Sequence, residues 1–287
     1  MRRQIAAQYA KLQQHLRSLG SVLVAFSGGV DSALLLKAAV ETLGREKVLA
    51  VTGRSPAVPR ADLADAHRLA TEIGARHEFL DTGEFENPQY TANPADRCYH
   101  CKNELFARLR ALARERGLAA VVNGDNADDL GDYRPGRAAA DCHAVRSPLA
   151  QCGIGKAALR EMAAALGLSV ADKPASPCLS SRVQYGEQIT PEKLQRIDAA
   201  ETLLREMGFA PCRVRHHGDL ARIEVTPAQI ERLAAGEARL RIERALRELG
   251  YRYVTLDMRG FRSGSMNERL PIAKPPPAGP SRNSEPV

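Results

Sequence analysis

Short apolar or β-branched runs alternate with helical periodicity along the first two thirds of the chain. The runs predict buried strands at 22–26, 48–52, 77–80 and 119–123. Apolar residues recur at helical spacing at 4–19, 32–43, 60–73, 102–116 and 159–166. Because strands alternate with helices, we predict an α/β fold built on a doubly wound, mostly parallel sheet.

The pattern changes after about residue 185. Residues 172–188 are rich in Pro, Ser and Gly and lack periodicity, so we expect a functional connector there. Thr190 and Pro191 predict the N-cap and first turn of a helix that runs to about Met207. Strands are then expected at 212–216, 221–225 and 253–258, with a helix at 227–249. We therefore predict a first domain over 1–185, a smaller α+β domain over 186–270, and a disordered tail over 271–287, which holds six of the 17 prolines.

Composition narrows the class of protein and of partner. With 44% hydrophobic and 26% charged residues in 287, the chain is not collagen-like, low-complexity or a disulfide scaffold. A net charge of +7 favours an anionic partner such as a phosphate ester or nucleic acid. The 5% aromatic content without Trp disfavours a dedicated binder of single strands. No apolar stretch or leader-like start is evident, so we expect a cytoplasmic protein without a membrane partner.

The segment Ser27-Gly28-Gly29-Val30-Asp31-Ser32 lies between the first predicted strand and the next helix. Glycines let the backbone approach an anion, and the helix adds its positive N-terminus. The alternative is a tight turn without a ligand, which the accompanying serines and aspartate make less attractive. The GxxxxGK[ST] spacing and its lysine are missing, so this is not a Walker loop.

These six residues resemble the SGGxDS loop of the N-type ATP pyrophosphatases, the PP-loop superfamily. The resemblance implies cleavage of ATP to AMP and pyrophosphate, adenylation of a substrate oxygen, and displacement of AMP by a nitrogen or sulfur nucleophile. It also implies that the ATP phosphates and Mg²⁺ are held at matching positions, with Asp31 as the metal ligand: Ser27, Gly28, Gly29, Asp31 and Ser32.

Two other segments carry weaker signals. Residues 153–158 fit GxGxxA, but they come late in the sheet after a weak strand, so a closely packed helix start explains them better than a dinucleotide site. Residues 123–129 form an acidic turn after the fourth strand. Its acids either bind Mg²⁺ or cap the next segment, and the sequence leaves both open.

Six cysteines in a cytosolic chain are reduced thiols, metal ligands or catalytic groups more often than disulfides. Cys98 and Cys101 form a single CxxC, which fits zinc, redox or iron-sulfur chemistry. With Cys178 of the connector, three thiolates would leave one iron of a 4Fe-4S cluster without a protein ligand, whereas structural zinc would want a fourth ligand. The remaining cysteines are interpreted as small buried hydrophobes: Cys142, Cys152 and Cys212.

Three further segments, with the phosphate loop, extend a resemblance over residues 27–267. Residues 93–102, 173–182 with Tyr185-Gly186, and 257–267 resemble the LarE family, ATP-dependent sulfur transferases of nickel-pincer nucleotide biosynthesis for lactate racemase. The resemblance implies adenylation of a carboxylate of pyridinium-3,5-biscarboxylic acid mononucleotide and sulfur delivery to give the thiocarboxylate. Some members sacrifice the sulfur at the Cys178 position, and others carry three cysteines and use a cluster. Cys98 and Cys101 point to the second group, so we expect a labile 4Fe-4S cluster on Cys98, Cys101 and Cys178.

The phosphorylated substrate needs an anion site outside the ATP loop. Arg213 and Arg215 alternate along a predicted strand and therefore share a face. With Ser181 and Arg182 they are predicted to form a phosphate clamp, and a solvated basic strand is the alternative.

Two acidic residues of the second domain are weaker candidates. Glu201 and Glu224 are predicted metal ligands at a subunit or domain junction, although either fits a surface carboxylate. We also expect a homo-oligomer. His216 and His217 have no metal-ligand spacing and stay unassigned.

Three rival functions remain. A tRNA-thiolating enzyme also combines an SGGxDS loop with a CxxC, but no added RNA-binding module is evident, so we expect no nucleic-acid partner. An ammonia-dependent synthetase would not use three placed cysteines. A nonenzymatic nucleotide- or metal-binding regulator would keep the loop without turnover.

Overall fold

The computed structural model describes residues 2–131, 135–174 and 176–262. The tail predicted at 271–287 and residues 263–267 of the third resembling segment lie outside these ranges. No helix within the described ranges is long and apolar enough to cross a membrane.

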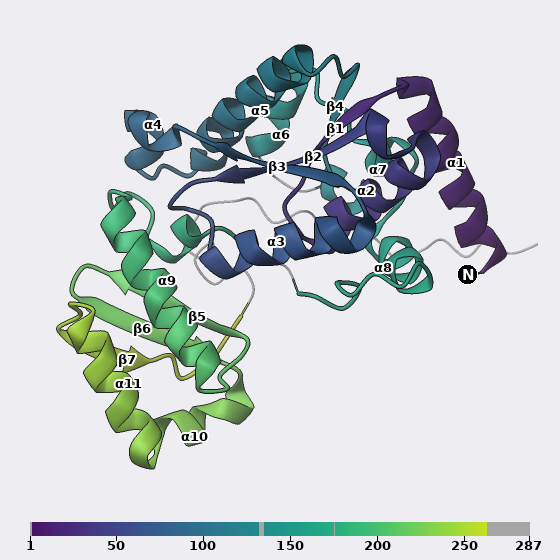
Figure 1. Cartoon of the computed structure of the whole chain (residues 1–287). Helices are drawn as coiled ribbons and strands as arrows, with labels where there is room; N and C mark the ends of the chain where they lie inside the picture. Colours follow the sequence, from purple (N-terminus) through teal and green to yellow (C-terminus); the bar gives the residue numbers. More distant parts are fainter. Residues whose placement is uncertain (1, 132–134, 175, 263–287) are drawn as a thin grey trace, which may run out of the picture.

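A parallel sheet forms the first half of the molecule, with its strands in the order β3-β2-β1-β4 (Figure 1). The strands are β1 (Val22–Ala25), β2 (Val48–Arg54), β3 (Arg76–Asp81) and β4 (Ala120–Val122). Val22 of the central strand lies opposite Val48 on one side and Ala120 on the other. The predicted parallel α/β sheet is confirmed.

Helices cover both faces of this sheet. Successive residues of β1 point to opposite faces, so neighbouring residues pack against different helices. Val22 and Val24 pack with α1 (Arg3–Leu19), α2 (Val30–Leu43), α3 (Arg60–Ile73) and α8 (Lys156–Ala165). Leu23 packs with α5 (Arg97–Glu115) and α6 (Pro135–Cys142) on the other face. The short elements between them are η1 (Arg45–Lys47), η2 (Glu84–Glu86), α4 (Pro88–Thr91), η3 (Ala127–Gly131) and α7 (Pro148–Gln151).

A smaller sheet follows, in the order β5-β6-β7. Its strands are β5 (Cys212–His217), β6 (Leu220–Val225) and β7 (Tyr253–Leu256). Residues of these strands share a core with α9 (Pro191–Glu206), α10 (Ile230–Ala234) and α11 (Gly236–Glu248). The predicted cap of α9 is confirmed, since the Thr190 side chain accepts from the Lys193 N–H at 3.3 Å.

The single helix predicted at 227–249 is wrong. The chain forms η5 (Pro227–Gln229) and then α10, becomes extended at Ala235, and starts α11 at Gly236 with φ of 54°. A continuous right-handed helix cannot include an extended residue followed by a positive φ.

A separate apolar cluster joins the two sheets. Ala57 follows β2, Leu179 begins η4 (Leu179–Arg182), and Ile197 lies on α9, and all belong to this cluster. Cys101 and Cys178 pack against it. The boundary predicted between residues 185 and 186 stays a prediction, because Val183 and Ile189 on its two sides share the cluster.

Candidate active site

The loop from Ser27 to Ser32 turns tightly between β1 and α2. The Ser32 hydroxyl donates to the Gly29 carbonyl at 3.1 Å and lies 3.2 Å from the Ser27 hydroxyl. Gly28 has φ of 70°, and a Cβ there would lie 3.1 Å from the Cα of Ala66 in α3. Glycine is therefore required both by the backbone and by close packing. The loop precedes the N-terminus of α2, where a phosphate is favoured.

Asp31 is held by residues of two segments that lie far from it along the chain. Its carboxylate accepts from the Asn126 amide at 3.0 Å and pairs with the ammonium of Lys156. The Lys156 backbone N–H donates to Asp128 at 2.7 Å, and a Cβ on Gly155 would lie 2.8 Å from that carboxylate. The closely packed helix start predicted at 153–158 is confirmed, and Asp128 of the acidic turn caps it.

Lys156 is a candidate site residue that sequence reasoning missed. A signal was present, because a lysine in the first turn of a helix opposes the helix dipole. Such a placement is explained if the ammonium serves a neighbouring anion. Here it reaches the phosphate loop through Asp31.

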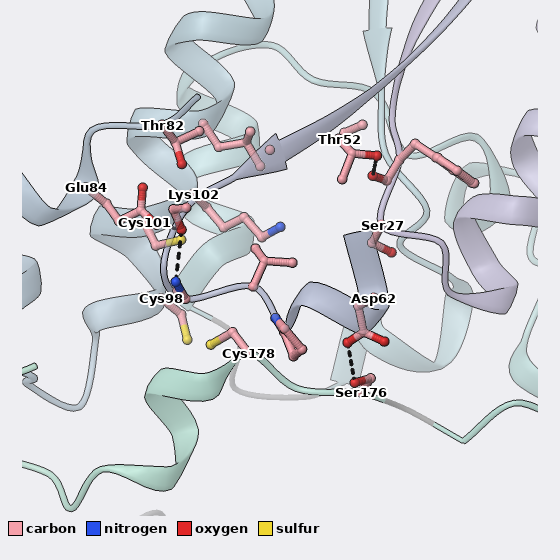
Figure 2. A pocket seen from close by; sticks show the side chains of 18 of the residues that line it. Ser27, Thr52, Asp62, Thr82, Glu84, Cys98, Cys101, Lys102, Ser176 and Cys178 are labelled. Atoms are coloured by element: carbon pink, nitrogen blue, oxygen red, sulfur yellow. Dashed lines mark hydrogen bonds between the residues drawn. The ribbon is translucent and has the colours of Figure 1, made fainter. Parts of the chain in front are cut away.

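One cavity of about 330 Å³ extends from the phosphate loop to the cysteines. Figure 2 shows Ser27 at one end and Cys98, Cys101 and Cys178 at the other, with the Lys102 side chain reaching into the space between. Thr52, at the carboxyl end of β2, also lines the cavity and donates its hydroxyl proton to the Phe26 carbonyl at 2.8 Å. The cavity thus lies at the carboxyl edge of the sheet, where this class of fold binds ligands.

The CxxC lies on a helix. The sequence predicted helix only from residue 102, but α5 begins at Arg97, so that prediction was five residues late. Cys98 and Cys101 are therefore three apart on a helical turn and lie on one face. Cys178 comes from the connector directly before η4. The structure brings together the three predicted thiols from two distant parts of the chain.

The surroundings of the CxxC favour neutral thiols. Burial raises the pKa of Cys101 to about 12, and the negative side chain of Glu84 adds to this while Lys102 opposes it. The surrounding protein and Cys178 also raise the pKa of Cys98, although part of that residue is exposed. A bound cation or metal would reverse this preference, since metals take thiolates.

The predicted cluster requires a set of iron ligands around the cavity. Within the described ranges no three His, Cys, Asp or Glu side chains lie close enough to hold a single metal ion. A multi-iron cluster places its protein ligands farther apart than a single ion does. Whether the cavity fits such a cluster therefore depends on which ligand atoms line it. Three sulfurs line the cavity together with Glu84, whose Oε2 is buried without a hydrogen-bond partner among the residues that the structure describes. This donor set fits an iron-sulfur cluster.

The connector that carries Cys178 is fastened to the first half of the molecule. Lys173 pairs with Asp65 at 2.8 Å and with Asp62 at 3.3 Å, and the hydrogen bond from Lys173 lowers the pKa of Asp65. The Ser176 hydroxyl donates to Asp62 at 2.7 Å. These contacts hold the connector along α3 and fix Cys178 at the cavity.

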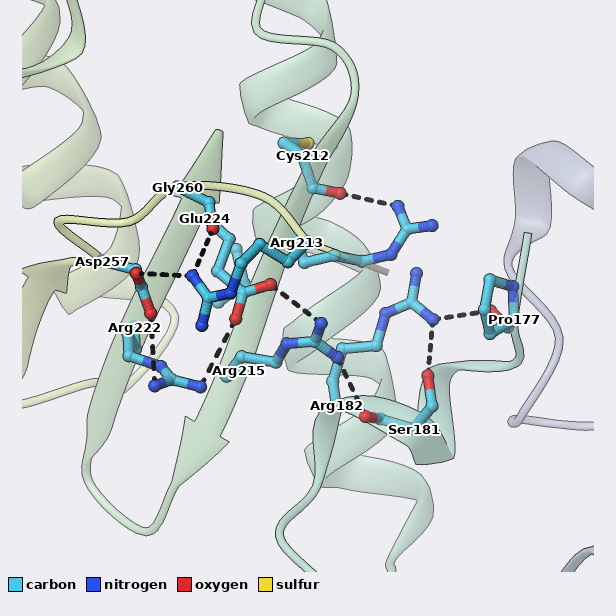
Figure 3. A network of polar contacts seen from close by, with 12 residues as sticks. Pro177, Ser181, Arg182, Cys212, Arg213, Arg215, Arg222, Glu224, Asp257 and Gly260 are labelled. Carbon is cyan, nitrogen blue, oxygen red and sulfur yellow. Dashed lines mark hydrogen bonds and ion pairs between the residues drawn. The ribbon is translucent and has the colours of Figure 1, made fainter. Parts of the chain in front are cut away.

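The four residues predicted as a phosphate clamp are also brought together (Figure 3). Arg182 is 1% exposed and donates to Glu201 at 2.9 and 3.1 Å and to the Cys178 carbonyl at 2.9 Å. Arg215 donates to the Ser181 carbonyl at 3.0 Å and to Glu224 at 2.8 Å. The network therefore supports the segment that carries Cys178.

Arg213 differs from its neighbours. Burial and the adjacent Arg182 lower its pKa, and its guanidinium lies over the Phe261 ring at 5.2 Å. A cation destabilised by a second cation would be favoured by a bound anion. The clamp itself stays a prediction, and Arg213 is its best-supported member.

Glu201 and Glu224 have guanidinium partners in place of the expected metal. Both are fully buried, and Glu201 also accepts from the Val214 N–H at 3.1 Å. Burial alone would raise the pKa of Glu201, but the Arg182 charge outweighs it and holds the pKa below its usual range. Their oxygens are occupied by N–H donors, so the geometry favours a structural role for both carboxylates.

The other cysteines are free thiols, as expected. Cys152 and Cys212 are buried, which confirms the interpretation as small hydrophobes. Cys142 is exposed, so the same interpretation was wrong there. Its position on α6 faces solvent, where sequence spacing gave no signal.

Comparisons with known proteins match both halves of the molecule. Residues 5–126 match the NAD synthase family. The chain is 45% identical over 266 residues to an uncharacterized protein of Synechocystis sp., covering 93% of this chain and 99% of the relative. It is 39% identical over 270 residues to the pyridinium-3,5-bisthiocarboxylic acid mononucleotide synthase of Lactiplantibacillus plantarum, covering 94% and 97%.

A solved structure of NMN synthetase from Francisella tularensis shares the fold. The TM-score is 0.50 with 21% sequence identity, over 60% of this chain and 75% of that one. At this identity the likeness concerns the fold alone.

Proposed function

The chain belongs to the family of the pyridinium-3,5-bisthiocarboxylic acid mononucleotide synthases, and from this premise we propose that it converts the corresponding biscarboxylate mononucleotide into its thiocarboxylate. It is an ATP-dependent enzyme of the PP-loop type. The observation that carries the proposal is the single cavity that connects Ser27 of the phosphate loop with the thiols of Cys98, Cys101 and Cys178. Activation and sulfur delivery can therefore occur in one cavity.

The first step is activation of a substrate carboxylate. ATP phosphates would bind the loop at Ser27, Gly28, Gly29 and Ser32. Mg²⁺ would bind Asp31 in exchange for the Asn126 and Lys156 donors that its carboxylate contacts in this structure. A carboxylate oxygen of the substrate attacks the α-phosphorus and pyrophosphate leaves. Lys156, next to Asp31, supplies positive charge where charge develops on the departing pyrophosphate.

The second step replaces oxygen by sulfur. A sulfur nucleophile attacks the activated carbonyl carbon, and AMP leaves with the former carboxylate oxygen. In the favoured version Cys98, Cys101 and Cys178 would hold a 4Fe-4S cluster, which would supply a transferable sulfide when bound. In the alternative the Cys178 sulfur itself is transferred and the residue is left as dehydroalanine.

The substrate phosphate is assigned to the arginine network, which consists of Arg182, Arg213 and Arg215 with their partners Glu201 and Glu224. Arg182 bonds the Cys178 carbonyl, so this network lies directly beside the sulfur-carrying segment. Arg213 would contact the phosphate. Ser181, Arg182 and Arg215, the other members of the predicted clamp, would hold Arg213 and the Cys178 segment in place through their hydrogen bonds and the pairs of the arginines with Glu201 and Glu224. Lys102, inside the cavity, offers its ammonium to the carboxylate or to AMP.

The test compares two sulfur acceptors under the same conditions. Purified enzyme and ATP are incubated with the biscarboxylate mononucleotide or with tRNA, and AMP, pyrophosphate and a sulfur mass gain are measured. We expect both signals with the mononucleotide only. Sulfur on tRNA would favour the tRNA-thiolating alternative, and ATP binding without pyrophosphate release would favour a regulator. The cytoplasmic location, the homo-oligomer and the lack of a nucleic-acid partner stay predictions.

A further inference from the structure

Glu84 is a buried carboxylate that neither step above employs. It begins η2 directly after β3 and lines the same cavity as the three thiols, yet it is only 2% exposed. Its Oε1 accepts from the Ser55 hydroxyl at 2.6 Å, while its Oε2 is buried without a hydrogen-bond partner in the described part of the chain. Leaving a carboxylate oxygen buried and unbonded is costly, so a ligand at this oxygen is expected.

The surroundings fix the direction of this carboxylate. The Ser55 oxygen that donates to Glu84 also accepts from the Ala57 N–H at 3.2 Å, which holds the hydroxyl in place. The Gly83 N–H donates to Glu104 of α5 at 3.1 Å, so the preceding turn is tied to the helix that carries the CxxC. Glu84 and Cys101 are thereby held together from two sides.

Glu84 shares its cavity with the three thiols. Glu84 is close enough to Cys101 to raise the pKa of that thiol, and both residues do the same to Tyr90, as does Cys178. No Lys or Arg within the described ranges forms an ion pair with Glu84. Arg108 and Lys102 lie near enough to act on this site electrostatically, but neither pairs with the carboxylate. A carboxylate beside thiols without a paired cation within the described ranges fits a place where a positively charged iron centre binds.

We propose that Oε2 of Glu84 is the fourth protein ligand of the 4Fe-4S cluster held by Cys98, Cys101 and Cys178. The inference rests on the proposed function, in its cluster version. The carboxylate donates an oxygen lone pair to the iron that the three thiolates leave open, and no electron is transferred. Oxygen is a harder ligand than thiolate and binds iron of such a cluster less firmly. Glu84 therefore closes the open iron at rest and yields to an incoming sulfide.

The experiment uses the full chain, reconstituted anaerobically with iron and sulfide. Wild type is compared with Glu84→Gln, with Glu84→Cys, and with Glu86→Gln as a matched control. Glu86 is an exposed carboxylate in the same turn. The readouts are iron per chain, the Mössbauer signature of the distinct iron, and the rate of iron loss to a chelator, none of which depends on turnover.

In Glu84→Gln the signature of the distinct iron changes, and iron is lost about tenfold faster or more. Removing a residue that only supports a metal ligand lowers metal affinity about 10- to 100-fold, and removing the ligand itself lowers it at least as much. In Glu84→Cys the spectrum becomes that of a cluster with four sulfur ligands, and iron loss slows. Glu86→Gln behaves as wild type. A Ser55→Ala variant, which loosens the carboxylate without removing it, is expected between wild type and Glu84→Gln, and it serves if the glutamine variant does not fold.

An unchanged spectrum and unchanged iron loss in Glu84→Gln overturn the inference. It is also overturned if wild type takes up no iron, and AMP release with the mononucleotide then still tests the adenylation on its own. The converse result, a normal Glu84-dependent cluster without AMP release, would remove the proposed function and leave the ligand assignment standing.

Discussion

The cavity and the arginine network differ in whether the oxygens of their buried carboxylates have hydrogen-bond partners. In the network, both oxygens of Glu201 and of Glu224 accept from guanidinium groups. In the cavity, one oxygen of Glu84 is buried without a hydrogen-bond partner within the described residues. The buried carboxylates of the network are therefore paired inside the protein, whereas the carboxylate of Glu84 is not.

This difference indicates that the arginine network has a structural role and that the cavity binds ligands. A buried carboxylate that is already paired has little left to bind, whereas an unpaired carboxylate that lines a cavity is a candidate for a ligand. The two regions meet at Cys178, whose carbonyl is held by Arg182 while its side chain lines the cavity. The network thus positions the part of the cavity wall that carries Cys178.

The largest effect is expected on removing the sulfur of Cys178, where the cavity and the arginine network meet. We expect Cys178→Ser to reduce thiocarboxylate formation to the detection limit, because both versions of the sulfur step require this thiol. Cys142→Ser, at an exposed thiol outside the cavity, is expected to retain wild-type activity. Product is quantified by mass spectrometry, and substantial sulfur transfer by Cys178→Ser would contradict the assignment.

The network should respond in stability. Glu201→Gln is expected to lower the free energy of unfolding by about 3–5 kcal/mol, because it leaves the Arg182 charge buried and unpaired. Urea denaturation measures the change. Glu243→Gln, which breaks an exposed pair with Arg247, is the control and should cost about 0–1 kcal/mol. Equal effects of the two substitutions would remove the distinction between a buried support and a surface pair.

Lys156 tests whether the phosphate end of the cavity acts as proposed. Lys156→Met is expected to lower kcat/KM for pyrophosphate release about 10- to 100-fold, because a charge-assisted contact worth about 1.5–3 kcal/mol is lost. Lys37→Met is the control, since Lys37 pairs with Glu41 on α2. If both variants released pyrophosphate at the wild-type rate, the ammonium would have no part in activation.

The smallest expected effect concerns the cavity wall. Burial, with a contribution from His67, lowers the pKa of His77 to about 4, and this ring lies 2.9 Å from the Thr52 hydroxyl. Between about pH 6.5 and 4 the unfolded chain binds more protons at this site than the folded one, so stability falls as pH falls. The loss is about 1 kcal/mol, since the ring is only partly shielded from solvent.

The check is a series of denaturation curves over that pH range for wild type and His77→Gln. The variant should show a shallower pH dependence, because a glutamine does not titrate. An identical slope would mean that His77 binds protons equally in both states.

Local patterns predicted the sheet and the phosphate loop but not the whole cavity. The loop was recognisable because two glycines and two serines stand between a strand and a helix. The start of α5 was missed because Cys, Tyr and His give no clear periodicity, and Arg97 is buried by stacking on the distant Tyr185 at 4.5 Å.

Glu84 gave no signal at all in the sequence. It stands in a polar segment, and its burial depends on Ser55 and on the arrival of Cys178, which are far away along the chain. The pairing of Glu201 with Arg182 likewise depends on how α9 packs against η4. Such roles follow from tertiary packing and were beyond the reach of spacing.

The central claim, that ATP activates a carboxylate which then receives sulfur in the same cavity, is tested most directly by following the displaced oxygen. The biscarboxylate mononucleotide is labelled with heavy oxygen in its carboxylates, and AMP and product are analysed by mass spectrometry after a single turnover. The account predicts one labelled oxygen in AMP for each sulfur gained by the product. Sulfur gain with unlabelled AMP would contradict it.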